Sequence, residues 1–161
     1  MKAFRAVAAI AALLPAPIGV CEPSNPGLQT CAADPTGVRL QIEVAGVRSN
    51  EGLIAITIYP DDRRRFLVHL GQIGILRTPA RSPITHVCAA LPAPGRYAVV
   101  VYHDANGDMA FNRTRLGLPA EDYGLSNNPP TLLGLPQFES VLILTNAGDN
   151  AIRIELRRAF R

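Results

Sequence analysis

From position 38 onward, the hydrophobic pattern of the chain repeats every two residues. In VRLQIEVAGV, apolar side chains alternate with other residues at Val38, Leu40, Ile42 and Val44. Because successive side chains of a strand point to opposite faces, this alternation is typical of a β-strand with one buried face. A second strand is expected over residues 53–59 in LIAITIYP, and SNEG before it predicts a turn, so the two strands are expected to pair as a hairpin.

Four further segments are predicted as strands: ITHVCAAL, RYAVVVYH, FESVLILT and AIRIELR. RYAVVVYH is apolar almost throughout, which favours a central position in a sheet. AGDN predicts a hairpin turn between the last two segments, GQIGILRTPA an edge strand or loop, and DDRRRFLVHL a short exposed helix. Six or seven strands with little helix predict an all-β fold. We expect an antiparallel β-sandwich of immunoglobulin-like or transthyretin-like type with one long loop.

The first residues have the composition of a secretory signal peptide. Lys2 and Arg5 precede the apolar run AVAAIAALL, which is too short to span a bilayer, and Pro15 follows it. Lipid anchoring through Cys21 is less favoured, because Val20 stands where lipoprotein cleavage sites prefer a small residue. No later segment has the length of a transmembrane helix, so none is expected in the mature chain.

These features divide the chain into three parts. We expect a signal peptide over 1–21, a linker rich in proline, serine and glycine over 22–36, and a β-sandwich domain over 37–158. The protein is accordingly expected to be periplasmic or secreted.

Removal of the signal peptide lowers the net charge. The chain has 16 basic and 13 acidic residues, a formal charge of +3, and without Lys2 and Arg5 it has 14 and 13, or +1. Nucleic-acid binders present a basic face interleaved with aromatic side chains, whereas this chain has no tryptophan and two short arginine clusters. We therefore expect no nucleic-acid partner, but a small ligand or another component of the cell envelope.

Three cysteines are placed at Cys21, Cys31 and Cys88. In an oxidising compartment, Cys21 is expected to bridge Cys31 if processing leaves Cys21 in place. Cys88 is expected to pack as a small hydrophobic side chain. There is no C-x-x-C and no paired Cys/His spacing, so zinc and thiol redox chemistry are not expected.

The long loop over residues 104–136 begins with HDANGDMAFN, where oxygen-bearing side chains recur at alternate positions. Loops of this length are often functional. A tightly curling backbone points alternate side chains into one concavity, and calcium takes six to eight oxygen ligands. The candidate metal ligands are Asp104, Asn106, Asp108 and Asn112. The remaining carboxylate is expected from Glu121 or Asp122 in LPAEDYG, with Glu121 favoured, and the candidate cofactor is Ca²⁺ or none.

Two departures exclude a helix–loop–helix calcium motif: Met109 stands at the glycine position and Arg115 at the position of the last carboxylate. The alternative is an ordinary polar turn, because Asn and Gly tolerate a positive φ. In that case Asp104 and Asn112 hydrogen-bond backbone amides instead of a metal.

The ordered segments GRYAVVVYHDANGD, GLPAEDYGLSNNPP and LPQFESVLILT resemble the bacterial domain-of-unknown-function family 2141. The matching positions are His103, Asp104, Asn106, Gly107, Gly117, Pro119, Glu121, Tyr123, Gly124, Ser126 and Asn127. The resemblance covers roughly residues 37–158 and implies an exported single-domain β-sandwich without an established activity. Family members more often read Asn-Gly-Lys-x-Asp in the loop, whereas this chain has Asp-Met-Ala-Phe-Asn and lacks the final carboxylate.

Two classes of function remain open. In a binding or accessory protein, His103, Tyr123 and Asn127 are the candidate binding residues, and no residue is catalytic. In a hydrolase-type enzyme, His103 would act as a base, with Glu121 as its carboxylate and Ser126 as the nucleophile. No G-x-S-x-G elbow or glycine-rich phosphate loop is present. We favour the non-catalytic class.

Overall fold

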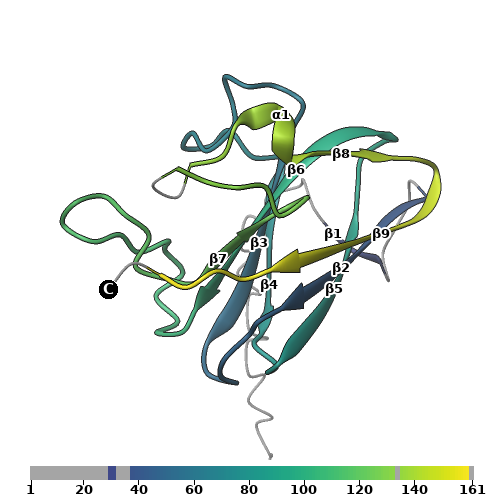
Figure 1. Ribbon diagram of the computed structural model, residues 1–161. Coiled ribbons are helices and arrows are strands. Elements are labelled where there is room, and N and C mark those ends of the chain that lie inside the picture. Colours follow the sequence, from purple (N-terminus) through teal and green to yellow (C-terminus); the bar gives the residue numbers. More distant parts are fainter. Residues whose placement is uncertain (1–28, 32–36, 133–134, 160–161) are drawn as a thin grey trace, which may run out of the picture.

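The computed structural model describes residues 29–31, 37–132 and 135–159. In these residues it contains nine strands and one short helix (Figure 1): β1 (Gln29–Thr30), β2 (Val38–Ala45), β3 (Leu53–Pro60), β4 (Gly74–Pro79), β5 (Ile84–Ala90), β6 (Gly95–Asp104), β7 (Tyr123–Leu125), α1 (Phe138–Val141), β8 (Leu142–Thr145) and β9 (Gly148–Glu155). The expected signal peptide lies outside the described residues. Within the expected linker, Gln29 and Thr30 form β1.

The strands form two sheets. One has the order β1-β5-β2-β9, and the other has the order β4-β3-β6-β7, with β8 also pairing with β6. All described pairs are antiparallel except β2 and β9, which run parallel from Val38 opposite Gly148 to Ala45 opposite Glu155. The predicted all-β sandwich is therefore confirmed, with one parallel pair inside it.

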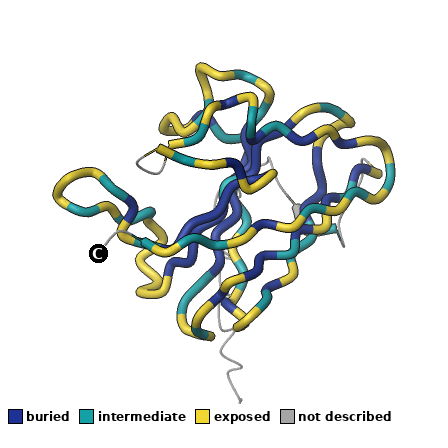
Figure 2. The backbone as a smooth tube through the Cα atoms, viewed as in Figure 1, coloured by how far each residue is buried: buried dark blue, intermediate teal, exposed yellow. Residues whose placement is uncertain are grey.

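The main core lies between the two sheets and follows the alternation in the sequence. In β2, the apolar side chains of Val38, Leu40, Ile42 and Val44 are at most 1% exposed. The β3 and β6 strands are buried along nearly their whole length, as the dark blue segments of Figure 2 show. Both faces of these strands are covered, which explains why their sequences are apolar almost throughout.

A second hydrophobic cluster covers the outward face of the five-stranded sheet. Tyr59 and Tyr102 project from β3 and β6. The rings of Phe66 and Phe111, from connecting segments, and of Phe138, from α1, belong to the same cluster. Ring centroids are 5.4 Å apart between Tyr59 and Phe66 and 5.2 Å apart between Tyr102 and Phe111. This cluster forms a second hydrophobic core on the outer face of the sheet.

The C-terminal segment joins the two sheets on one side. The Tyr123 amide donates to the Arg157 carbonyl at 3.1 Å, and the Arg157 amide donates back to the Tyr123 carbonyl at 2.7 Å. Gly124 permits this approach, because a Cβ at that position would lie 2.5 Å from Cγ2 of Ile154. The pairing closes the sandwich between β7 and β9.

Several local predictions are wrong. The two expected hairpins do not form, because β2 and β3 lie in different sheets, as do β8 and β9. DDRRRFLVHL forms turns instead of a helix, and the FESV part of FESVLILT forms α1 instead of strand. GQIGILRTPA contributes the edge strand β4, as one of the two alternatives predicted.

The cysteine prediction is also wrong. Cys31 forms a disulfide with Cys88, with the two Cα atoms 5.4 Å apart, a normal separation for a disulfide. The neighbours of Cys88 in β5, Val87 and Ala89, lie on the core-facing side, opposite Ile42 and Leu40 of β2. Because side chains alternate along a strand, Cys88 lies on the outer face, where the N-terminal segment reaches it.

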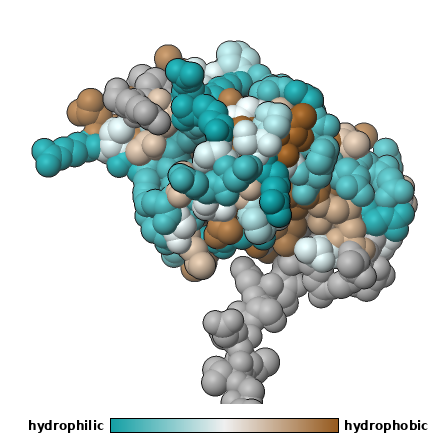
Figure 3. Space-filling view, turned by 90° about the horizontal axis from the view of Figure 1, so that it is seen from below, coloured by the Kyte–Doolittle hydropathy of each residue, from teal (hydrophilic) through white to brown (hydrophobic). Residues whose placement is uncertain are grey.

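None of the helices in the described residues is long and apolar enough to cross a membrane. Seen from below, the surface is largely hydrophilic, with hydrophobic residues gathered toward the lower centre of the view (Figure 3).

Candidate functional site

The end of β6 places His103 and Asp104 on opposite faces of the sheet. His103 follows the alternation of Val99 and Val101, whose side chains lie in the main core, whereas Asp104 follows Tyr102 on the outer face. His103 is 5% exposed, and its Nε2 lies 2.8 Å from the Glu51 carbonyl oxygen. Since a carbonyl only accepts, Nε2 carries the hydrogen and ties β6 to the turn before β3.

The carboxylate of Asp104 shapes the start of the loop. Its Oδ1 accepts the backbone N–H of Gly107 at 2.7 Å and of Asp108 at 3.2 Å, and its Oδ2 accepts that of Met109 at 2.8 Å. The side chain has no exposed surface. Gly107 and Met109 both have positive φ, 72° and 64°, so the loop curls tightly around this one carboxylate.

Asp108 points into the loop and is braced by its neighbours. Its Oδ2 accepts the side-chain amides of Asn106 at 2.9 Å and Asn112 at 2.6 Å, and its Oδ1 accepts the Ala110 amide at 2.9 Å. These hydrogen bonds, the Ala110 amide first, lower the pKa of the Asp108 carboxyl. Asn106 and Asn112 therefore support an ionised carboxylate.

Glu121 reaches the same place from the returning half of the loop. The Ala120 amide donates to the Asn112 carbonyl at 2.9 Å, and Oε2 of Glu121 accepts the Asn112 amide at 3.1 Å. Burial is the main cause that raises the pKa of the Glu121 carboxyl to about 7, and the charges of Asp104 and Asp108 raise it further against the effect of the Asn112 amide.

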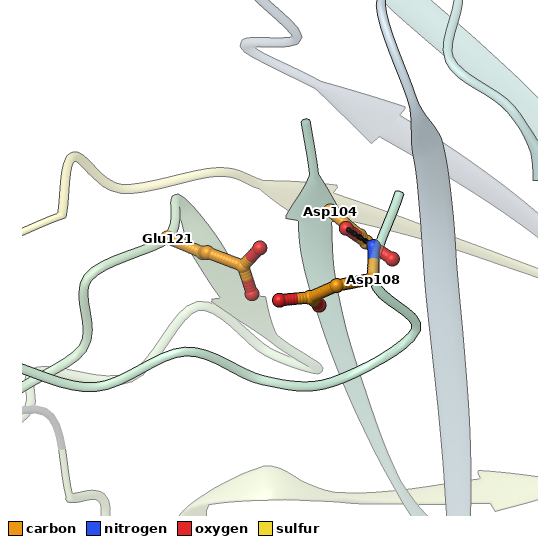
Figure 4. Close-up of side chains that lie close together, drawn as sticks. All are labelled: Asp104, Asp108 and Glu121. Atoms are coloured by element: carbon orange, nitrogen blue, oxygen red, sulfur yellow. Dashed lines mark hydrogen bonds between the residues drawn. The ribbon is translucent and has the colours of Figure 1, made fainter. Parts of the chain in front are cut away.

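These three side chains form what we call the carboxylate triad: Asp104, Asp108 and Glu121. One oxygen of each lies within 4.8 Å of the others, and Figure 4 shows the carboxyl groups of Asp108 and Glu121 turned toward each other. Among the ion pairs of the described residues, none includes a triad member. Three converging carboxylates offer only oxygen donors, the set that suits a hard cation such as Ca²⁺.

Ser126, the candidate nucleophile, is engaged in structural hydrogen bonds. Ser126 has no exposed surface; its Oγ accepts the Val99 amide at 3.0 Å and donates to the Val141 carbonyl at 2.5 Å. Val99 and His103 lie four residues apart on one strand, roughly 13 Å. The structure therefore brings His103 and Glu121 together but keeps Ser126 away from them.

Tyr123 and Asn127 are likewise engaged in local contacts. Tyr123 is 4% exposed, and its hydroxyl lies 3.3 Å from Oγ1 of Thr131. The Asn127 amide donates to the carbonyls of Ser140 at 3.2 Å and Leu142 at 2.9 Å. The cleft that His103 lines includes neither Tyr123 nor Asn127.

A cleft of about 320 Å³ lies beside the triad. His103 and Glu121 line it together with Arg48 and Asp122. Arg48 donates from Nε to Oδ2 of Asp122 at 2.6 Å, and Asp122 is 6% exposed. This buried carboxylate is paired, unlike those of the triad.

A larger groove, of about 530 Å³, lies on the outward face of β4, β3 and β6. We call it the outer groove; its floor comes from the sheet, and its sides come from residues 67–72 and 109–113. Tyr59 and Tyr102 both line this groove. The groove itself was missed, although the exposed apolar residues of FLVHL, within a charged segment, are a signal that could have indicated it.

The comparisons with known proteins support one assignment. A family model described as "Uncharacterized protein conserved in bacteria (DUF2141)" matches residues 42–153. Neither the curated proteins nor the solved structures contain a significant match.

Proposed function

We propose that this chain, which belongs to the uncharacterized bacterial family DUF2141, is an exported, non-catalytic binding protein of the cell envelope whose 104–122 loop is held in shape by a calcium ion. The observation that carries the proposal is the carboxylate triad, whose ligand atoms lie within 4.8 Å of one another. The triad joins the outgoing and returning halves of the loop.

A cation would relieve a repulsion that the fold builds in. Asp104 is fixed by three backbone amides and Asp108 by Asn106 and Asn112, so neither can turn away from the other without breaking these bonds. Like charges held this close disfavour ionisation, and a divalent ion offsets their repulsion. Because every donor is oxygen, calcium is favoured over the transition metals, and water would complete its coordination.

Export is supported by the disulfide and by the N-terminal sequence. Cys31 and Cys88 are joined, and disulfides persist in oxidising compartments outside the cytoplasm. The residues before them have the charge and length of a signal peptide. The proposed location is the periplasm or the exterior, as a free protein more than as a lipid-anchored one.

A hydrolase-type site is a second candidate, favoured by one observation. His103 and Glu121 line the same cleft, and a Glu121 pKa of about 7 suits general acid–base catalysis near neutral pH. Because the Ser126 hydroxyl is buried elsewhere, the nucleophile would be water. Hydrolysis of 4-nitrophenyl acetate by the protein, abolished in Glu121→Gln, would favour this candidate; equal rates in both proteins and in buffer would remove it.

Calcium binding is tested by thermal unfolding of chelator-stripped protein with and without calcium. A ligand that binds only the folded state stabilises it by about 2.7 kcal/mol at a hundredfold excess over Kd, which raises Tm by several degrees. Asp108→Asn and Glu121→Gln preserve side-chain shape and remove one charge each, so we expect both to reduce the shift. Glu139→Gln removes an exposed carboxylate outside the triad and should leave the calcium-induced shift in Tm unchanged.

The result that would overturn the proposal is a melt unchanged by millimolar calcium, or a shift that persists undiminished in both triad variants. A parallel titration with magnesium distinguishes a calcium site from general screening of negative charge, since magnesium demands a tighter octahedral geometry.

A further inference from the structure

We propose that the outer groove binds a single-chain amphipathic anion, an apolar tail with one carboxylate-type head group, taken up from solution as a monomer. The proposal deepens the binding role proposed above by naming a ligand class. It rests on four properties of the groove: its neutral floor, its exposed apolar rim, its unpaired cations and its size.

The floor is made by two cross-strand rows on the outward face of the sheet. In one row, Thr57 lies between Ile75 and Val100, and in the other Ala55 lies between Arg77 and Tyr102. The rings of Tyr59 and Tyr102 also line the groove, and a tyrosine hydroxyl is neutral near pH 7. Arg77, on the edge strand β4, is the charged residue of these two rows, and the other floor residues are uncharged.

The rim exposes large apolar side chains that the fold does not bury. Four of the eight exposed large hydrophobic residues in the described chain line the groove: Leu67 at 38%, Val68 at 52%, Leu70 at 74% and Met109 at 62%. Exposed apolar groups gathered in one place mark binding surfaces. A bound apolar tail would remove this apolar surface from water, which is energetically favourable.

Three residues at the rim have an unfavourable backbone conformation. Leu67, Leu70 and Met109 have φ values of 57°, 59° and 64°, a region that side chains other than Gly and Asn adopt at an energetic penalty. Three of the five non-glycine residues with positive φ in the described chain therefore border this groove. Packing in a core does not account for these conformations, since all three side chains are exposed.

The charges lining the groove are of one sign. Arg77 and Arg113 line it, and no carboxylate does. Arg77 donates to the Met109 carbonyl at 3.1 Å and Arg113 to the Gly117 carbonyl at 2.8 Å; neither belongs to an ion pair of the described residues. The carbonyl partners are uncharged, as is the Phe111 ring 5.1 Å from the Arg113 guanidinium. Because no carboxylate pairs with either arginine in the described residues, the groove is complementary to an anionic head group.

The size of the groove fits a small ligand. Its volume of about 530 Å³ lies within the range of roughly 300–1,000 Å³ of small-molecule sites. The Met109 and Phe111 side of the groove belongs to the loop that the triad organises. Calcium at the triad would fix that side and cancel nearby negative charge, so we expect it to tighten binding of the anion.

The test is calorimetric titration of the purified protein with dodecanoate below its micellar concentration, with calcium and with chelator. Dodecyltrimethylammonium supplies the same tail with a cationic head, and acetate supplies a carboxylate without a tail. We expect one dodecanoate per chain, binding of the cationic amphiphile weaker by about tenfold or more, and no measurable heat from acetate.

Matched variants locate the site. Leu70→Asn tolerates the positive φ and removes an apolar rim contact, and Arg113→Gln removes a cation; each should weaken dodecanoate binding by about tenfold. Leu144→Asn changes a leucine that is 69% exposed on β8, outside the groove, and Arg64→Gln changes an arginine whose side chain is 94% exposed. Both controls should bind as the parent does.

Equal affinity for the two amphiphiles, equal weakening in Leu70→Asn and Leu144→Asn, or no binding of dodecanoate would overturn the proposal. Preferential sedimentation with anionic over zwitterionic vesicles, without monomer binding, would replace the free amphiphile by a membrane surface. Calcium stabilisation without dodecanoate binding would remove only this inference. Dodecanoate binding of equal affinity with calcium and with chelator would remove only the expected coupling between the groove and the triad.

Discussion

At the scale of single residues, the same types of side chain have opposite uses in this protein. Ser126 and Asn127 were candidate site residues, and both are consumed by backbone contacts to α1 and β8. Asp104 and Glu121 also accept hydrogen bonds from backbone amides, but these bonds do not neutralise a carboxylate charge. A reactive side chain is a candidate for a site only when its structural hydrogen bonds leave a charge or a polar atom available to a ligand.

Ser126→Ala is expected to destabilise the protein without affecting calcium binding. The change leaves the Val99 amide and the Val141 carbonyl without their hydroxyl partner in a fully buried position, which costs about 1–3 kcal/mol. Urea unfolding would measure the loss. In Ser140→Ala, where the hydroxyl is partly exposed and bonds within α1, water replaces the contact and the loss should be small. Equal stability of Ser126→Ala and the parent would contradict the assigned contacts.

The pH dependence of stability should report on Glu121. Its pKa rises from 4.5 to about 7 on folding, so between these values the folded state holds more protons than the unfolded state. The free energy of unfolding therefore falls as the pH rises through this window and levels off above it. Because Glu121 is partly exposed and solvent screens it, the fall is on the order of 1 kcal/mol.

The measurement compares metal-free unfolding of the parent and Glu121→Gln from pH 4.5 to 8. The difference between the two curves isolates Glu121, since the other titrating groups are shared. Saturating calcium should abolish the fall by holding Glu121 ionised. Parallel curves for parent and variant would show that the carboxyl titrates normally.

At the scale of elements, the sequence predicted which segments form strands better than which strands pair. The alternation in β2 and the apolar run of β6 depend on local side-chain exposure, and both strands are where they were expected. The partners depend on contacts between distant residues: SNEG and AGDN have turn-forming residues, yet each leads from one sheet to the other. Turn composition indicates a change of direction and carries no information on which sheet the chain enters.

The candidate site divides in the same way. The oxygen-bearing side chains of HDANGD and LPAEDYG predicted Asp104, Asp108 and Glu121 as a group, and the structure places their carboxylates together. Their role as metal ligands stays a prediction. The side-chain amides of Asn106 and Asn112 turned out to brace Asp108. The outer groove is built from three strands and two loops, so the exposed apolar residues of FLVHL indicate only one of its sides.

Gly124→Ala is expected to weaken the contact between β7 and β9. A Cβ there would lie 2.5 Å from Cγ2 of Ile154 and 2.9 Å from the Glu155 carbonyl oxygen, so the strands must separate, at a cost of about 1–3 kcal/mol. Gly95→Ala is the control, since its Cβ would have no neighbour closer than 3.8 Å. Thermal unfolding should separate the two variants, and equal midpoints would rule out a tight approach at Gly124.

At the scale of the whole molecule, the Cys31–Cys88 disulfide fastens the N-terminal segment to the four-stranded sheet. It spans 57 residues, a loop for which chain-entropy arguments give about 4 kcal/mol of stabilisation. We expect the double variant Cys31→Ser/Cys88→Ser to lose stability of that order, measured by urea unfolding. Cys21→Ser keeps the bond and should match the parent; a loss in Cys21→Ser equal to that of the double variant would point to a different pairing.

The parallel pairing of β2 with β9 joins residues about 110 positions apart. Such distant contacts form slowly, because a long stretch of chain must first be brought together. During synthesis, β2 leaves the ribosome long before its partner exists, and the four-stranded sheet stays incomplete until the last strand emerges. The edge of β2 that β9 covers therefore stays without its partner until residues 148–155 have been synthesised.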